Sequence, residues 1–429
     1  HVAVAERAGD RLSAAQLAIC ESCNIIARGL DESILGGNKA RLDPRRLTWP
    51  RCIADRVLHE QLRRCVTGLG SADSDFAVIP REESFITAAE SEPAALASFC
   101  IDEQDFITRF PRMVIGWRGS GAPVHLAEVL DHPAIASVAP ITAVQPLWIN
   151  ETLADEVDFA ADDMAVDNRV YPRFEHGCSS ELPCPSVAAI RSALALGGCV
   201  AVVGGGLLGL EKFLDVACQA AALAPRALVM HAALSEVQQW GQDAPDAAES
   251  GAALWQSRVL LLERFGLPPL VALESERQDE SEAREVASLL ATYGVRCAPY
   301  VMATREDEED DLAELTRAVS TAVEEMRPLM RLIGLGHSAR GQLHDLANVI
   351  FGASVEFSPT VEGQLTRLEQ MSADYLPVVL DTVENELPDV LSQGGAATYQ
   401  MSVVYATSTE WRAAAGYLKV VLRKMERGF

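Results

Sequence analysis

The chain has 429 residues, and 36 Lys and Arg stand against 61 Asp and Glu, which gives a formal net charge of -25. Because phosphate contacts need clusters of basic side chains, this charge excludes default binding to nucleic acid or to an acidic membrane surface. Hydrophobic residues make up 49% of the chain, which excludes disorder and predicts two or three domains with sizeable cores. We find no apolar run of 18 residues and no secretory leader, so we expect a soluble cytoplasmic protein.

The ten cysteines are spread along the chain and do not form a disulfide framework, which favours reduced thiols. Cys20 and Cys23 have the spacing of a metal-ligand pair, but no second pair follows at the distance typical of a zinc finger. Cys52 and Cys65 fall in sequence that looks helical. We therefore interpret these cysteines as ordinary core residues and predict no metal site.

In the first half, the apolar spacing predicts a helix over 11–35. Further predictions are a short basic helix over 58–66, a helix over 85–100 and a strand over 113–117. The acidic segment 155–175 is predicted to be an exposed loop.

The second half alternates between the two kinds of element, which is typical of a parallel sheet covered by helices. We predict strands at 199–203, 227–231, 269–273 and 295–301, and helices at 207–222, 254–265 and 280–293. The six residues 306–311 are all acidic, and they would open a further helix, where negative charge suits the helix dipole.

A glycine-rich turn lies between the first predicted strand and helix of this half. It contains Gly204 and Gly205 and satisfies the GxGxxG pattern of a dinucleotide site. The acid that would contact the ribose is missing, because the second strand ends at Met230 and His231. Close helix–strand packing explains the glycines better than a cofactor does.

Read in order, longer stretches of the chain resemble the formate–tetrahydrofolate ligase (formyltetrahydrofolate synthetase) family. The matches include NIIARGLDESILGGNKARLDPRRLTWPR, FITAAESEPAALASFCIDEQDFITRFPRMVIGWRGSGAPV, EHGCSS, GLLGLEKFLDVACQAAALAP, ERFGLPPLVAL, ATYGVRCAPYV, VIFGASVEFSP and YLPVVLDT. They run collinearly from about residue 24 to 420. The resemblance implies an ATP-dependent ligase fold and folate-linked one-carbon chemistry.

The chain departs from the family pattern first in the region that would bind the nucleotide. The resemblance places a phosphate loop and an Arg-Glu-Pro segment upstream of Asn24, and only about twenty residues precede that position here. Phosphoryl transfer to formate needs such backbone amides and a lysine around the γ-phosphate. We therefore expect a divergent paralogue that lacks the N-terminal phosphate-loop region.

The folate side departs as well. Where the family has an aromatic residue this chain has Glu276, where it has a tryptophan this chain has Met302, and Thr382 replaces a family lysine. Stacking of a pterin needs an aromatic face, which neither Glu nor Met offers. The acids of 306–311 would also repel an anionic tail.

What the chain retains of the family pattern includes His176, within EHGCSS, and Lys212, within EKF. If an ancestral ligand contact survives, these two residues are expected to make it, although a purely structural role is the favoured explanation of both. The candidate remnant cleft comprises His176, Lys212, Gly204, Gly205, Glu276 and Met302, with no catalytic residue and no metal ligand.

The resemblance implies an α/β fold: a P-loop-NTPase-like parallel-sheet domain without its phosphate loop over 1–235, and two smaller α/β domains over 236–330 and 331–429. The function that we predict is that of a catalytically degenerate structural or regulatory subunit in one-carbon metabolism. It would form a homo-oligomer or a complex with another one-carbon enzyme, without nucleic acid or membrane. The alternative is a folate-dependent formyl-transferring enzyme, or a ligase subunit whose ATP site comes from a partner chain. No cofactor is expected; ATP and tetrahydrofolate would bind only if the family function is retained.

Overall fold

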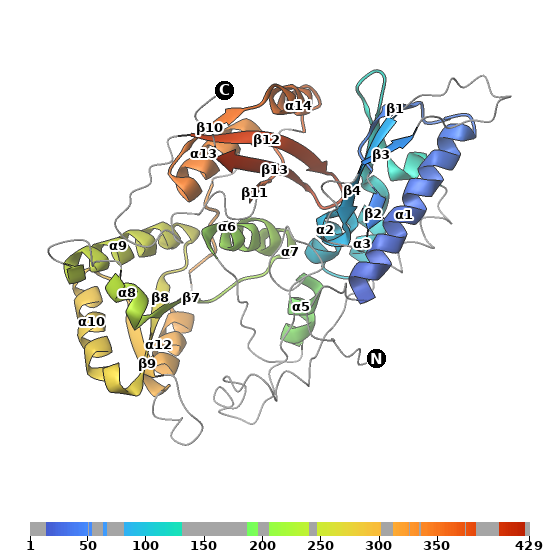
Figure 1. Cartoon of the computed structure of the whole chain (residues 1–429). Coiled ribbons are helices and arrows are strands. Elements are labelled where there is room, and N and C mark those ends of the chain that lie inside the picture. The colour runs from blue at the N-terminus through green and yellow to red at the C-terminus, as the bar shows by residue number, and fades with distance from the viewer. Residues whose placement is uncertain are drawn as a thin grey trace.

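The computed structural model places helices around several small sheets (Figure 1). The residues that the structure describes are 14–49, 51–53, 63–66, 81–130, 187–195, 206–239, 247–301, 312–325, 327–333, 336–373, 375–382 and 403–424. The predicted segments 155–175, 199–203 and 306–311 lie outside them.

The N-terminal part combines one long helix with two three-stranded sheets. Helix α1 (Ala14–Leu35) confirms the helix predicted over 11–35. In one sheet β1 (Leu42–Leu47), β5 (Val114–Arg118) and β6 (Pro123–His125) pair antiparallel in that order. In the other, β4 (Arg81–Thr87) lies between β2 (Arg51–Ile53), to which it is parallel, and β3 (Arg63–Val66), to which it is antiparallel. The remaining elements are η2 (Ala88–Glu90), α2 (Glu92–Phe99), α3 (Glu103–Arg109), η3 (Phe110–Arg112) and η4 (Leu126–Glu128).

Two predictions in this part are wrong in detail. Residues 63–66, predicted as the end of a basic helix, form strand β3, and residues 85–87, predicted as helical, end strand β4. Cys52 and Cys65 accordingly lie in strands, not helices. In both places pairing with a strand distant in sequence overrides the local pattern. The strand predicted over 113–117 is confirmed as β5.

The middle part contains the parallel sheet that the alternating pattern predicted. Strands β7 (Leu228–Ala233), β8 (Pro269–Ser275) and β9 (Cys297–Val301) are parallel and lie in that order. The helical elements of this part are α8 (Leu234–Gln239), α9 (Ala247–Leu262), η6 (Glu263–Phe265), η7 (Arg277–Asp279), α10 (Glu280–Thr292) and α12 (Ala313–Glu324). Buried side chains of α8, α9 and α10 form one core with the strands, and Trp255 is the largest of them.

The predicted helix 207–222 is present, but its middle is widened. It follows α5 (Val187–Ala195) in the described chain, and it begins as α6 (Gly206–Glu211), continues as the π-helix η5 (Lys212–Cys218) and ends as α7 (Gln219–Ala221). Insertions of π-helix into α-helices are found frequently at functional sites.

The C-terminal part is a mixed four-stranded sheet with the order β10-β12-β13-β11. Its strands are β10 (Ser354–Phe357), β11 (Val378–Thr382), β12 (Val403–Arg412) and β13 (Tyr417–Lys424). Strands β10 and β11 run parallel to their neighbours, whereas β12 and β13 are antiparallel. Helices α13 (Ala339–Phe351) and α14 (Pro359–Gln370) begin at Ser338 and Ser358, whose side chains accept a backbone N–H of the first turn.

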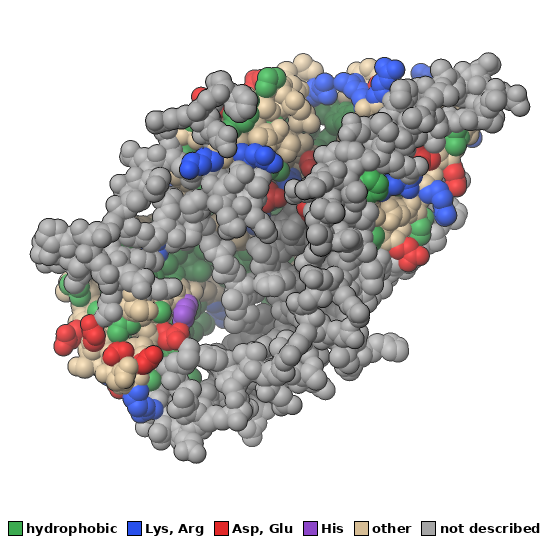
Figure 2. Space-filling model, viewed as in Figure 1, with side chains coloured by type: hydrophobic (Ala, Val, Ile, Leu, Met, Phe, Trp, Pro, Cys, Tyr) green, Lys and Arg blue, Asp and Glu red, His purple; other side chains and the backbone are tan. Residues whose placement is uncertain are grey.

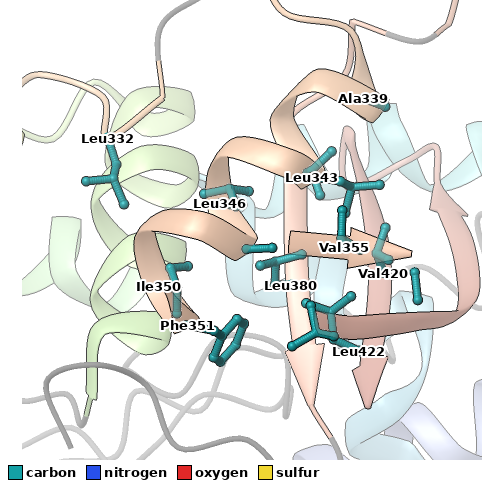
Figure 3. Close-up of a cluster of buried hydrophobic side chains, with 14 of the residues drawn as sticks. Leu332, Ala339, Leu343, Leu346, Ile350, Phe351, Val355, Leu380, Val420 and Leu422 are labelled. Atoms are coloured by element: carbon teal, nitrogen blue, oxygen red, sulfur yellow. The ribbon is translucent and has the colours of Figure 1, made fainter. Parts of the chain in front are cut away.

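The largest core joins α13 to this sheet and to the widened helix. Leu343, Leu346 and Ile350 of α13 face Leu380 and Val420 of the sheet (Figure 3). Leu207 and Leu214 belong to the same cluster, so α6 and η5 are packed firmly against the C-terminal part. The α/β class is therefore confirmed, while the P-loop-NTPase-like topology and the division at 235 and 330 stay predictions.

Candidate functional site

The widened helix places three charged side chains in the protein interior. Glu211, Lys212 and Asp215 are 2%, 3% and 6% exposed. Burial of a charged group is costly unless partners are supplied, so such groups persist where the surroundings hold them. Lys212 and the two acids have different partners, which come from segments distant in sequence.

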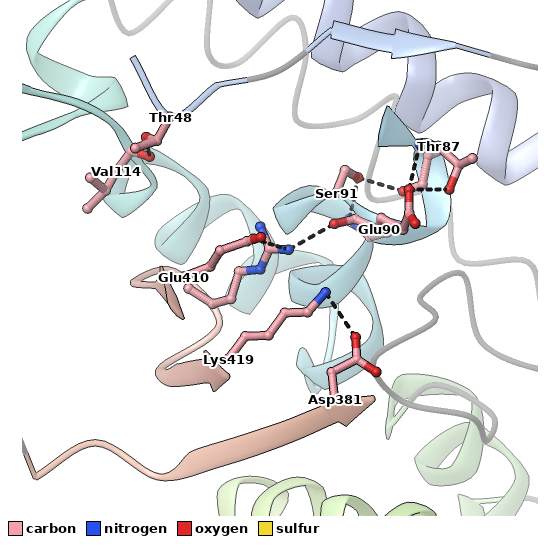
Figure 4. A network of polar contacts seen from close by, with 11 residues as sticks. Thr48, Thr87, Glu90, Ser91, Val114, Asp381, Glu410 and Lys419 are labelled. Atoms are coloured by element: carbon pink, nitrogen blue, oxygen red, sulfur yellow. Dashed lines mark hydrogen bonds and ion pairs between the residues drawn. The ribbon is translucent and has the colours of Figure 1, made fainter. Parts of the chain in front are cut away.

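Lys212 lies beside the carboxyl end of strand β11. Its Nζ is 4.0 Å from Oδ1 of Asp381, and Nζ of Lys419, from the adjacent strand β13, is 3.2 Å from Oδ2 of the same carboxylate. The side chains of the two lysines are 4% and 8% exposed, whereas that of Asp381 is 28% exposed. Figure 4 shows the contact between Lys419 and Asp381. We call Lys212, Asp381 and Lys419 the lysine site.

The lysine site brings two ammonium groups to one carboxylate. It lies at the end of a parallel strand, which is where α/β sheets present their ligands. A site of this composition suits a small anion such as a carboxylate or a phosphate, for which lysine acts as a point charge.

The two acids face a different neighbour, the segment 327–333. Oδ2 of Asp215 accepts the backbone N–H of Leu332 at 2.7 Å, and the carbonyl of Asp215 accepts Nη2 of Arg331 at 3.0 Å. Glu211, Asp215, Arg331 and Gln342 line a cavity of about 20 Å³. Glu211 Oε2 and Asp215 Oδ1 have no hydrogen-bond partner among the described residues, and a cavity of this size accommodates one water molecule.

Burial changes the protonation of both acids. Desolvation, followed by the nearby charge of Asp215, raises the pKa of Glu211 well above its usual range. Burial likewise raises the pKa of Asp215 to about 7, although the N–H of Leu332 and the charge of Arg331 oppose the change. Both acids therefore keep their protons to a higher pH than a free carboxyl does, and Asp215 is about half protonated near pH 7.

A second cavity lies between the C-terminal sheet and the N-terminal part. It has a volume of about 130 Å³, and Thr48, Trp117, Arg367, Trp411 and Arg412 are among the residues that line it. Arg412 ties its walls together, because its Nη2 contacts Glu410 at 2.8 Å and donates to the carbonyl of Glu90 at 2.8 Å (Figure 4).

The carboxyl end of β8 has the opposite charge. Glu276 is exposed and accepts Nε2 of Gln278 at 2.8 Å. Two residues earlier, Oε2 of Glu274 lies 2.5 Å from Nε2 of His231 and accepts the hydroxyl of Tyr300 at 3.2 Å. Burial, the charge of Glu274 and this hydrogen bond raise the pKa of Tyr300. We call Glu274, Glu276, His231 and Tyr300 the acidic edge, and Figure 2 shows acidic side chains gathered over this part of the molecule.

Of the residues predicted for the remnant cleft, Lys212 and Glu276 are described, and they contact different elements. His176, Gly204, Gly205 and Met302 lie outside the described residues. Sequence reasoning missed Asp381 and Lys419, although a lysine within the apolar run YLKVVL was a signal of a buried charge. In the part of the chain that the structure describes, no group of three or more His, Cys, Asp or Glu side chains is arranged to hold a metal ion.

The strand order and helix placement define a mixed α/β protein with parallel sheets and a charged site at the end of a parallel strand. The sequence profile of the family described as formate–tetrahydrofolate ligase matches residues 12–427. The chain belongs to the formate–tetrahydrofolate ligase family, as the resemblance predicted.

Individual relatives carry the same description at low identity. The formate–tetrahydrofolate ligase of Acidiphilium cryptum is 31% identical over 398 residues, which cover 89% of this chain and 67% of the relative. That of Haloarcula marismortui is 26% identical over 94% of this chain and 72% of the relative, and that of Paracoccus denitrificans is 30% identical over 85% and 64%. The chain thus spans about two thirds of the length of these relatives. Among the described residues, no helix is long and apolar enough to cross a membrane.

Proposed function

We propose that this chain acts in folate-linked one-carbon metabolism as a structural or regulatory subunit, and that it does not itself carry out the ligase reaction. Membership of the formate–tetrahydrofolate ligase family supports the metabolic setting. The chemistry of the acidic edge supports the loss of the reaction.

The observation that carries this proposal is the state of Glu276. The resemblance places an aromatic residue at this position, and a planar pterin ring needs an aromatic face for stacking. Glu276 is instead an exposed carboxylate that hydrogen-bonds to Gln278. Glu274 adds a second carboxylate to the same strand end, with His231 and Tyr300 as its partners. This edge disfavours an anionic folate through like charge.

An assay of the ligase reaction tests the proposal. The chain is incubated with formate, ATP and tetrahydrofolate, and both phosphate release and formyl-tetrahydrofolate are measured, with the Paracoccus denitrificans ligase as the positive control. We expect neither product above the protein-free blank. Formation of both products in equal amounts would show that the chain is a ligase.

We also propose that the chain works as an assembly, either a homo-oligomer or a complex with another one-carbon enzyme. Large apolar side chains are exposed on separate elements, among them Leu260 of α9 and Met330. Size-exclusion chromatography with light scattering measures the assembly directly. A mass that is a multiple of the 46.2 kDa chain, or co-elution with a partner from the native source, is expected. A stable monomer at all concentrations and no co-eluting partner would contradict this.

The lysine site supports a second candidate function, a folate-dependent formyl-transferring enzyme or a ligase subunit whose ATP site comes from a partner chain. The family lysine is absent at Thr382, but Lys419 brings an ammonium group to the carboxyl end of the same strand. Together with Lys212 it could hold formate or the oxygen of a formyl group. Calorimetry with formate separates the candidates: binding that Lys419→Met abolishes would favour the second, and no heat would favour the first.

A further inference from the structure

Three cysteines from two elements of the N-terminal part meet in one cluster. Cys20 and Cys23 lie one turn apart on α1, and Cys52 comes from strand β2. All three are buried, and they share a small core with Ala88 and Ala94. The spacing of Cys20 and Cys23 was evident in the sequence, but the arrival of Cys52 was not. We call Cys20, Cys23 and Cys52 the thiol cluster.

Asn24 holds the two elements of the thiol cluster in register. Its Nδ2 lies 3.8 Å from Sγ of Cys20 and donates to the carbonyl of Cys52 at 2.9 Å. Its Oδ1 accepts the backbone N–H of Cys52 at 3.1 Å. One side chain thus fixes the backbone of β2 against the helical turn that carries Cys20. Strand β2 is fixed in turn by β4, since Cys52 is the register partner of Ile86.

The three thiols are chemically unequal. A hydrogen bond from the Cys52 thiol lowers the pKa of Cys20 to about 7, in spite of burial and the charge of Glu21. The same interaction, together with one to Cys23 and with burial, raises the pKa of Cys52. A thiolate therefore forms at Cys20, beside a thiol that can attack it after oxidation. Burial, followed by the charge of Asp105, raises the pKa of Cys100, which serves as an internal reference.

We propose that the thiol cluster is an oxidation site, in which Cys20 reacts with hydrogen peroxide and Cys52 then forms a disulfide with it. The assignment rests on the position of these two cysteines, because Asn24 contacts both of them and holds their elements together. In the first step the Cys20 thiolate attacks one peroxide oxygen, the O–O bond breaks, and a sulfenic acid and hydroxide form; a proton converts the hydroxide to water. In the second step the Cys52 sulfur displaces water from the sulfenic acid. The two thiols together lose two electrons and become a disulfide, and one hydrogen peroxide is reduced to two water molecules.

A disulfide at this place would connect α1 to the β2-β4-β3 sheet by a covalent bond. The alternative use of clustered thiols is a soft metal ion, but the described residues supply no group arranged to hold one. The proposal is independent of whether the chain binds folate, so its failure leaves the proposed function untouched.

The first test measures reactivity on the whole chain without any substitution. The native protein is labelled with limiting iodoacetamide at pH 7, and each cysteine is followed by peptide mass spectrometry. Because a thiol of pKa 7 is half ionised at this pH, we expect Cys20 to be alkylated roughly tenfold faster than a thiol with an ordinary pKa, and far faster than Cys100. Equal rates for Cys20 and Cys100 would overturn the assignment.

The second test identifies the product. After a stoichiometric dose of peroxide and blocking of remaining thiols, we expect a peptide pair linked through Cys20 and Cys52, which thioredoxin or dithiothreitol separates. With Cys52→Ala the sulfenic acid should persist and react with dimedone, whereas Cys100→Ala should leave the linkage unchanged. No linkage at Cys20 would contradict the proposal, and so would a tightly bound zinc ion that protects all three thiols. The wild-type peptide map decides the matter even if a variant fails to fold.

Discussion

Two parallel strand ends in this molecule carry opposite chemistry. At the end of β11, two buried lysines surround the partly exposed carboxylate of Asp381. At the end of β8, Glu274 and Glu276 stand with His231 and Tyr300, and Glu276 is open to solvent. Both ends are positions where an α/β sheet presents ligands, so the contrast concerns their charge and their burial.

The two strand ends differ in how strongly the fold constrains their charged side chains. The two ammonium groups of the lysine site are enclosed by packed structure, so removing Asp381 takes a carboxylate away from two buried charges. The charges at the end of β8 that face water can change at little cost to the fold. A change of ligand chemistry is thus structurally easy at β8 and difficult at β11.

The largest expected effect at a single pH comes from Asp381→Asn, which keeps the shape of the side chain and removes its charge. Because Lys212 and Lys419 would then face each other without that carboxylate, we expect a loss of about 3 kcal/mol in the free energy of unfolding. Urea denaturation measures it. The control is Glu280→Gln, which disrupts the exposed pair with Arg284 and should leave the free energy of unfolding almost unchanged. Equal losses for the two variants would remove the distinction between the lysine site and a surface ion pair.

A pH series on Asp215→Asn tests the buried acids behind the lysine site. The pKa of Asp215 is about 7 in the folded protein against 3.8 for an unperturbed carboxyl, so between these values the folded chain holds a proton that the unfolded chain has released. Stability therefore falls as the pH rises from 4 to 7. Relative to the variant, the wild type should lose about 1.4 kcal/mol for each pKa unit of that difference. A constant difference between the two proteins from pH 4 to 8 would show that Asp215 is not held protonated.

The smallest effect on stability is expected at the acidic edge. Because Glu276 is exposed and accepts a hydrogen bond from the nearby Gln278, both Glu276→Phe and Glu276→Ala should change the free energy of unfolding by less than about 0.5 kcal/mol. The same urea titrations measure it. A loss above 2 kcal/mol would show that this carboxylate supports the fold and would end the contrast with β11.

The sequence allowed the parallel sheet to be predicted, because the strands at 227–231, 269–273 and 295–301 are short apolar runs between clear helical patterns. Prediction was wrong at 63–66 and 85–87, where the strands exist through pairing with partners distant along the chain. The π-helix at Lys212–Cys218 was also missed, since the widened turn depends on what packs around it.

The candidate site was predictable only in part. Lys212 was singled out because it matches the family pattern, and Glu276 because it departs from it. Asp381 and Lys419 were not, because the contact between strands β11 and β13 joins residues that are far apart in sequence. The meeting of Cys52 with Cys20 and Cys23 has the same cause, since a spacing rule sees only residues on one helix.

The most direct test of the central claim is a calorimetric titration of tetrahydrofolate into the wild type and into Glu276→Phe side by side. We predict no measurable heat of binding for the wild type, because the end of β8 presents a carboxylate where a pterin needs an aromatic face. Tight binding of tetrahydrofolate by the wild type, unchanged in the variant, would contradict it.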